Sequence, residues 1–134
     1  MGVARVPYCM YKSPSPSPNS QRMKCLTLRQ PYAAAVVLGL RLAEPREGPT
    51  DYRGPLLIHA AAGRPSPAGL QAYPQVGPEW LVRNAILGVV DLAGCVRRGS
   101  DYLWVLSNPR PLEVPFPCRG RKGLWDPPPG IELP

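Results

Sequence analysis

The run KCLTLRQPYAAAVVLGLRLAEPR, residues 24–46, decides how the rest of this chain is interpreted. Lys24 to Leu28 is a short run in which three of the five residues are apolar, and it predicts a short strand. The chain then turns at Gln30, and Pro31 suits the first position of a helix because its missing N–H removes no hydrogen bond there.

A compact helix is predicted to follow this turn, since three consecutive alanines are the best helix formers. One apolar stripe is expected at helical spacing, formed by Ala33, Val36, Val37 and Leu40. Gly39 is expected to end the helix in a left-handed conformation. A short helix that reverses the chain would bring the polar residues on its two sides to one end, which is a site hypothesis.

Composition limits the class of protein. The 134 residues leave room for one domain, and 20 prolines with 13 glycines favour short strands and tight connections over long helices. The net charge is +7, and without the first 22 residues it is +4. A modestly basic domain fits a polyanionic partner, although a merely solvated surface explains the charge equally well.

Several classes of site are disfavoured. Four widely spaced cysteines and one histidine form no zinc pattern, so we expect no metal and no cofactor. Cys25 and Cys95 lie in apolar strand patterns and are expected to be buried thiols. No run approaches a membrane span and the N-terminus lacks a signal-peptide core, so no membrane role is expected and the chain is interpreted as cytoplasmic.

Three segments are expected: a disordered Ser/Pro-rich tail at 1–22, a folded domain at 23–127 and a Pro-rich end at 128–134 with nothing left to pair with. The tail is expected to be irrelevant to activity, and a protein partner recruited through it is not expected. Residues 63–77 are expected to be loop and 78–83 a helical turn. Further strands are predicted at 52–61, 85–96, 102–106, 112–118 and 124–125. With one helix, such strands indicate a mainly β (α+β) fold, a small and partly closed barrel.

Three motifs in order resemble the ASCH domain family: the turn Gln30-Pro31-Tyr32, the signature Gly39-x-Arg41-x-x-Glu44-x-Arg46, and the strand RGPLLIHA at 53–60. The later runs ILGVVDL, YLWVLSNP and GLW resemble the family's later strands in the same order. The resemblance covers roughly residues 24–127. It implies a PUA-like β-barrel with one or two short helices and a role around RNA metabolism or translation.

Arg41, Glu44 and Arg46 are the first candidates for a binding site. On an extended segment Glu44 and Arg46 share a face, and Arg41 opposes them unless the chain bends. One interpretation is a structural ion pair. The other is a charged cleft in which the arginines hold a phosphate or base edge and Glu44 accepts a hydrogen bond from an exocyclic amine.

Other candidates would complete the lining of this cleft. Gln30 either caps the helix or reads a base edge, and Tyr32 either packs on the barrel or stacks on a base. His59 is most simply a hydrogen-bonded structural residue, and Arg53 lies near the start of its strand. The basic run with Arg119, Arg121 and Lys122 is expected at the rim, and with Arg97 and Arg98 it would extend a positive track.

Catalysis is disfavoured by one departure from the family. ASCH-like enzymes that hydrolyse modified cytidine use a lysine where this chain has Arg41 and a threonine where it has Glu44. An arginine stays protonated and cannot act as a general base. If the protein were an enzyme, His59 and Glu44 would be the catalytic candidates.

The leading hypothesis is therefore an RNA- or nucleotide-binding module. A small ribonuclease or modified-nucleoside hydrolase using the same cleft is the second, and an adaptor acting through the Pro-rich tail is the third.

Overall fold

The computed structural model describes residues 23–134, so the expectations for the tail at 1–22 lie outside the described residues. Its centre is one six-stranded sheet of order β2-β5-β4-β3-β1-β6. The strands are β1 (Lys24–Leu28), β2 (Ala43–Arg46), β3 (Gly54–Ala60), β4 (Ala85–Arg98), β5 (Asp101–Pro117) and β6 (Leu124–Trp125).

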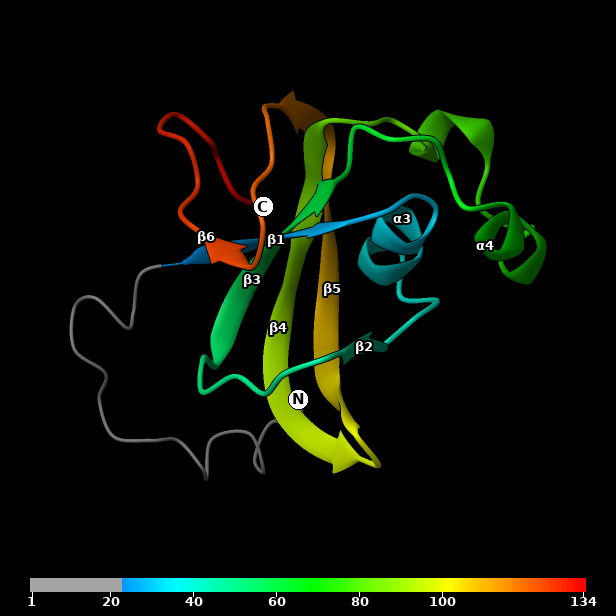
Figure 1. The fold of residues 1–134 in the computed structure, drawn as a ribbon. Coiled ribbons are helices and arrows are strands. Elements are labelled where there is room, and N and C mark those ends of the chain that lie inside the picture. The colour runs from blue at the N-terminus through cyan, green and yellow to red at the C-terminus, as the bar shows by residue number, and fades with distance from the viewer. Residues whose placement is uncertain (1–22) are drawn as a thin grey trace.

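Strand β1 runs parallel to β3, and the other neighbouring strands are antiparallel. The sheet curls strongly around helix α3 (Tyr32–Val37), so that β2 comes to lie across the lower part of the half-barrel (Figure 1). The expectation of a small, mainly β, barrel-like fold with short helices is confirmed.

Each face of the sheet carries its own apolar cluster. Leu56, Ile58 and Ala60 of β3 pack with α3 on the inner face, whereas Leu57 belongs to the outer cluster with Trp125. The side chains of β3 therefore alternate between the two faces of the sheet. Because every residue of α3 from Ala33 to Val37 is buried, the helix fills the hollow of the curled sheet.

The end of α3 differs from the prediction in one residue. Gly39 takes a left-handed φ of 81°, as expected, but the helix has already ended at Val37. The chain therefore leaves the helical path before Leu40, which is 39% exposed and does not continue the apolar stripe. Pro31 occupies the N-cap position, one residue earlier than predicted.

A helix, α4 (Pro67–Ala72), replaces part of the loop expected at 63–77. Its N-cap is Ser66, whose hydroxyl accepts from the Gly69 amide at 3.1 Å. Gly69 packs so closely on α3 that an added Cβ would lie 2.7 Å from the Pro31 ring. The expected helical turn that follows is the 3-10 helix η1 (Pro78–Trp80).

Strands β4 and β5 form one long hairpin instead of three shorter strands. Register shifts along the pair, together with a left-handed Asn108 (φ 53°), let β5 bend through the turn expected at Asn108 without ending. The second half of β5 contains four prolines, at 109, 111, 115 and 117. On the side away from β4, no described strand pairs with this half of β5, so it forms an edge of the sheet.

Candidate functional site

Arg41 is the centre of a cluster at the end of α3. Its Nε lies 3.3 Å from Glu44 Oε1 and its Nη1 lies 3.2 Å from the Tyr73 hydroxyl. Its guanidinium carbon stands 4.7 Å from the centre of the Tyr32 ring. Arg41 precedes β2, so the chain bends there and places Arg41 on the same side as Glu44.

Two aromatic rings support this arginine. The Tyr32 and Tyr73 rings meet edge to face, with centroids 6.2 Å apart. The Tyr32 hydroxyl lies 3.5 Å from the Ser66 hydroxyl at the start of α4. The guanidinium plane is thus fixed by a ring on one side and by polar partners at its edge, while the side chain keeps 22% of its surface exposed.

The Glu44 carboxyl is more enclosed, with 13% of its side chain exposed. Burial raises its pKa, and the charges of Arg41 and Arg46 oppose that rise in part. Arg46 lies on the same side of β2, with its guanidinium carbon 5.2 Å from the centre of the Trp104 ring. Arg41, Glu44 and Arg46 therefore form one charged group on β2 and the segment just before it.

The Gln30 side chain and Nη1 of Arg53 make hydrogen bonds within the protein itself. The Gln30 side chain is fully buried; its amide donates to the Trp80 and Val82 carbonyls, and its oxygen accepts from the Ala34 amide. These contacts fit the helix-capping alternative. Arg53 Nη1 donates to the Thr50 and Tyr52 carbonyls and so holds the loop before β3.

His59 lies on the outer face of β3, opposite the face that packs on α3, and is 1% exposed. Its Nε2 lies 2.7 Å from the Cys118 carbonyl oxygen, so this nitrogen carries the proton and donates. Its Nδ1 accepts from the Thr27 hydroxyl at 3.1 Å, and that oxygen accepts from Trp125 Nε1 at 3.1 Å. Burial lowers the pKa of His59 against the opposing effect of the Cys118 carbonyl.

The basic loop, residues 119–122, passes directly over His59. A Cβ on Gly120 would lie 2.5 Å from Thr27 Oγ1 and 2.6 Å from the His59 ring, so only glycine allows this approach. A hollow of about 480 Å³ opens beside the loop. Its described lining contains three cations and no carboxylate, and consists of Thr27, His59, Ala61, Ala62, Asn84, Arg119, Gly120, Arg121 and Lys122.

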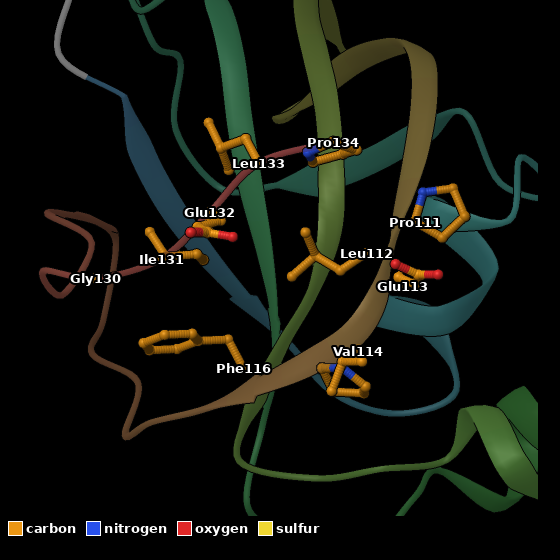
Figure 2. A pocket seen from close by; sticks show the side chains of 11 residues that line it. Pro111, Leu112, Glu113, Val114, Phe116, Gly130, Ile131, Glu132, Leu133 and Pro134 are labelled. Carbon is orange, nitrogen blue, oxygen red and sulfur yellow. The ribbon is translucent and has the colours of Figure 1, made fainter.

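A second hollow, of about 550 Å³, has the opposite charge. It lies between β5 and the C-terminal residues 130–134, and its lining includes Phe116 and Ile131, which both pack against the outer apolar cluster (Figure 2). Glu113 and Glu132 are its only charged lining residues among those described. A polyanion is repelled here and attracted to the hollow beside the basic loop.

The basic residues do not form one continuous track. Arg98 lies opposite Asp101 in the strand register at the tip of the β4–β5 hairpin. The basic loop follows Pro117, at the far end of the same hairpin. The structure thus separates the candidates into two groups. One group lies around the segment between α3 and β2 and consists of Tyr32, Arg41, Glu44 and Arg46. The other lies on the outer face of the sheet and consists of His59, Arg119, Arg121 and Lys122.

Two curated proteins are similar to this chain. It is 30% identical over 125 residues to activating signal cointegrator 1 of Mus musculus, and equally so to activating signal cointegrator 1 of Homo sapiens. Each match covers 75% of this chain and 22% of the relative, so the chain spans about a fifth of the length of these proteins. No protein-family model matches. The similarity supports the ASCH-like character that the motifs indicate.

Sequence reasoning missed Tyr73, Thr27 and Asn84. Tyr73 is the one aromatic residue of the expected loop at 63–77, which is the only signal that marks it. Neither Thr27 nor Asn84 carries a local signal, because each acquires its role from a neighbour far away in the sequence.

Two features are absent from residues 23–134: a cluster of metal-binding side chains and a helix that could span a membrane. In this range, no three of His, Cys, Asp and Glu lie close enough to hold a metal ion. No helix in this part of the chain is both long and apolar enough to cross a membrane. Cys25 is a buried free thiol, as expected, whereas the free thiol of Cys95 is only half-buried.

Proposed function

We propose that the folded part of this chain is an ASCH-like, PUA-related domain that binds RNA or a nucleotide-sized ligand. The observation that carries the proposal is the fixed position of Arg41 between the Tyr32 ring, the Tyr73 hydroxyl and the Glu44 carboxylate. Groups from three separate segments converge on one partly exposed guanidinium. The mainly β fold and the similarity to the two relatives agree with such a domain.

The chemistry of this cluster suits a nucleobase. A planar guanidinium backed by an aromatic ring offers a face on which an unpaired base stacks. Glu44 offers a carboxylate that accepts from an exocyclic amine, and Arg46 adds a second positive charge nearby. In this arrangement Gln30 positions the helix from within and does not touch the ligand.

The test is binding of single-stranded RNA and of nucleosides by the wild type beside Arg41→Ala, at two salt concentrations. Removing one stacking partner weakens binding by about 1–3 kcal/mol, which corresponds to roughly 5- to 150-fold in Kd. Arg98→Gln removes the same charge at the hairpin tip and is the matched control. Equal binding by Arg41→Ala and by the control would reject this site.

Hydrolysis remains the second candidate because burial raises the pKa of Glu44, a change that suits an acid catalyst. The role would fall to Glu44 alone, since both ring nitrogens of His59 are already bonded within the fold. Turnover of RNA or modified nucleosides that disappears in Glu44→Gln, with binding retained, would support an enzyme. No turnover by the wild type would exclude it for those substrates.

A further inference from the structure

We propose that the hollow beside the basic loop is a second contact site for single-stranded RNA, holding one nucleotide unit of a strand that also occupies the Arg41 cluster. This inference rests on the proposed function and extends it. It begins from the lining of the hollow, where Arg119, Arg121 and Lys122 are exposed and no described lining residue is acidic. Exposed cations around a concave surface are the usual contacts for phosphate.

The floor of the hollow is rigid. His59 and Thr27 are locked by the bonds that also join them to Cys118 and Trp125. Gly120 packs directly against the side chains of Thr27 and His59, and this contact fixes the path of the basic loop. The cations at the rim therefore project from a loop whose backbone is already placed, which lowers the ordering cost of binding.

Asn84 adds an amide to the cationic wall. Its backbone N–H donates to the Ala60 carbonyl at 2.8 Å, and its carbonyl accepts from the Cys118 amide at 3.1 Å. With φ at 57°, it holds a left-handed conformation between η1 and β4. An exposed asparagine amide pairs with the N6 and N7 edge of adenine, so the hollow combines phosphate contacts with one group that distinguishes bases.

The two sites are joined by the short loop after β3. Ala62 lines the hollow, and Ser66, four residues later, lies beside the Tyr32 hydroxyl. Four residues span at most about 14 Å, so the two sites lie within reach of one short strand. Arg29 is bonded to this loop, because its Nε donates to the Arg64 carbonyl oxygen at 2.8 Å. Arg29 and Arg64 are both exposed and add positive charge to the surface between the two sites.

The acidic residues nearby do not neutralise the positive charge of this surface. Asp126 stands in the adjoining hollow together with Arg119 and Arg121, but its carboxylate is paired with Lys24 at 2.8 Å. The acidic hollow between β5 and residues 130–134 contains none of the cations of the basic loop. A bound strand is thereby directed over the loop after β3 and not toward the chain's C-terminal residues.

The experiment compares the wild type, Arg121→Gln, Arg119→Gln and the hairpin-tip control Arg98→Gln. Each is titrated with adenosine monophosphate and with a single-stranded oligoadenylate of about 16 nucleotides, the upper site size of a small binding fold. Circular dichroism verifies that each variant is folded. Log Kd is followed against log salt.

The expected result is a smaller salt dependence for the oligomer in Arg121→Gln and Arg119→Gln, by about 0.7 in slope for each phosphate that is no longer neutralised. The control keeps the wild-type slope, and binding of the mononucleotide at the Arg41 cluster is unchanged in all three variants. A fourth variant, Asn84→Ala, is titrated with oligoadenylate and with oligouridylate, and its affinity is expected to fall more for oligoadenylate than for oligouridylate.

Two results overturn the inference. If mononucleotide binding persists while Arg121→Gln and Arg119→Gln match the control on the oligomer, the hollow does not touch the strand and only the second site is rejected. If the wild type binds neither ligand at low salt, the proposed function fails and the inference fails with it.

Discussion

The ring nitrogen Nε2 of His59 donates to the carbonyl oxygen of Cys118, 59 positions further along the chain, at 2.7 Å. This bond ties the end of β5 and the basic loop to the middle of the sheet. It also completes a chain of donors and acceptors from Trp125 through Thr27 to His59. The histidine therefore fixes the loop that carries Arg119, Arg121 and Lys122.

Replacing His59 with phenylalanine is expected to destabilise the protein. The ring is kept, but the Thr27 hydroxyl and the Cys118 carbonyl each lose a buried partner, at a cost of about 1–3 kcal/mol. Urea unfolding should show a lower midpoint with an unchanged slope. An unchanged midpoint would mean that water replaces the ring nitrogens without loss.

Stability is expected to fall as the pH drops below about 6.5, the usual pKa of histidine. The fold holds His59 neutral and lowers its pKa, so below this pH the unfolded chain binds more protons than the native one. The stability that neutral His59 contributes is fully present above the pKa of histidine in the unfolded chain. It is lost as the pH falls toward the lower pKa of His59 in the folded protein. Thermal melts across this range should show that the loss of stability on acidification is larger in the wild type than in His59→Phe.

Gly120→Ala is expected to displace the basic loop, because the new methyl would lie 2.5 Å from Thr27 Oγ1 and 2.6 Å from the His59 ring. Both the free energy of unfolding and the affinity for RNA should decrease. Gly48→Ala is the control, since its added methyl meets nothing within 4 Å. Equal melting temperatures for the two variants would show that the loop moves aside freely.

The affinity of the Arg41 cluster for a nucleoside with an exocyclic amine is expected to fall on acidification. The carboxylate form of Glu44 accepts the hydrogen bond, and because burial raises its pKa, this form is lost at a higher pH than for an ordinary glutamate. Binding titrations over a pH series measure the effect. Glu44→Gln should bind more weakly and without this pH dependence; a parallel decline in the variant would assign the effect to another group.

The strands with regular alternation were predictable from the sequence. In β3, the run of consecutive apolar residues is typical of a strand that is buried on both faces, and apolar clusters do cover both faces of this strand. The spacing indicated that Glu44 and Arg46 share a face, whereas the pairing of Arg41 with Glu44 required a bend of the chain before β2. Gln30 was recognisable as a residue of the turn, but its three hydrogen bonds to η1, the following loop and α3 were not.

The remainder depended on contacts between distant segments. Helix α4 forms in a run rich in proline and glycine because Ser66 caps it and Gly69 packs on α3. Ser66 before Pro67 is a local signal for a helix start, but the packing of Gly69 on α3 is not visible in the local pattern. Tyr73 reaches Arg41 only once that helix is in place. The separation of His59 from the Arg41 cluster likewise follows from the face of β3 on which it lies.

The prolines in the second half of β5 have a consequence for how copies of this protein meet. An uncovered sheet margin normally offers amide donors to which another polypeptide adds as an extra strand. Four residues there have no N–H to offer, so such addition is blocked along much of this margin. Two molecules that approach from this side must associate through side chains, which guards the native protein against edge-to-edge aggregation.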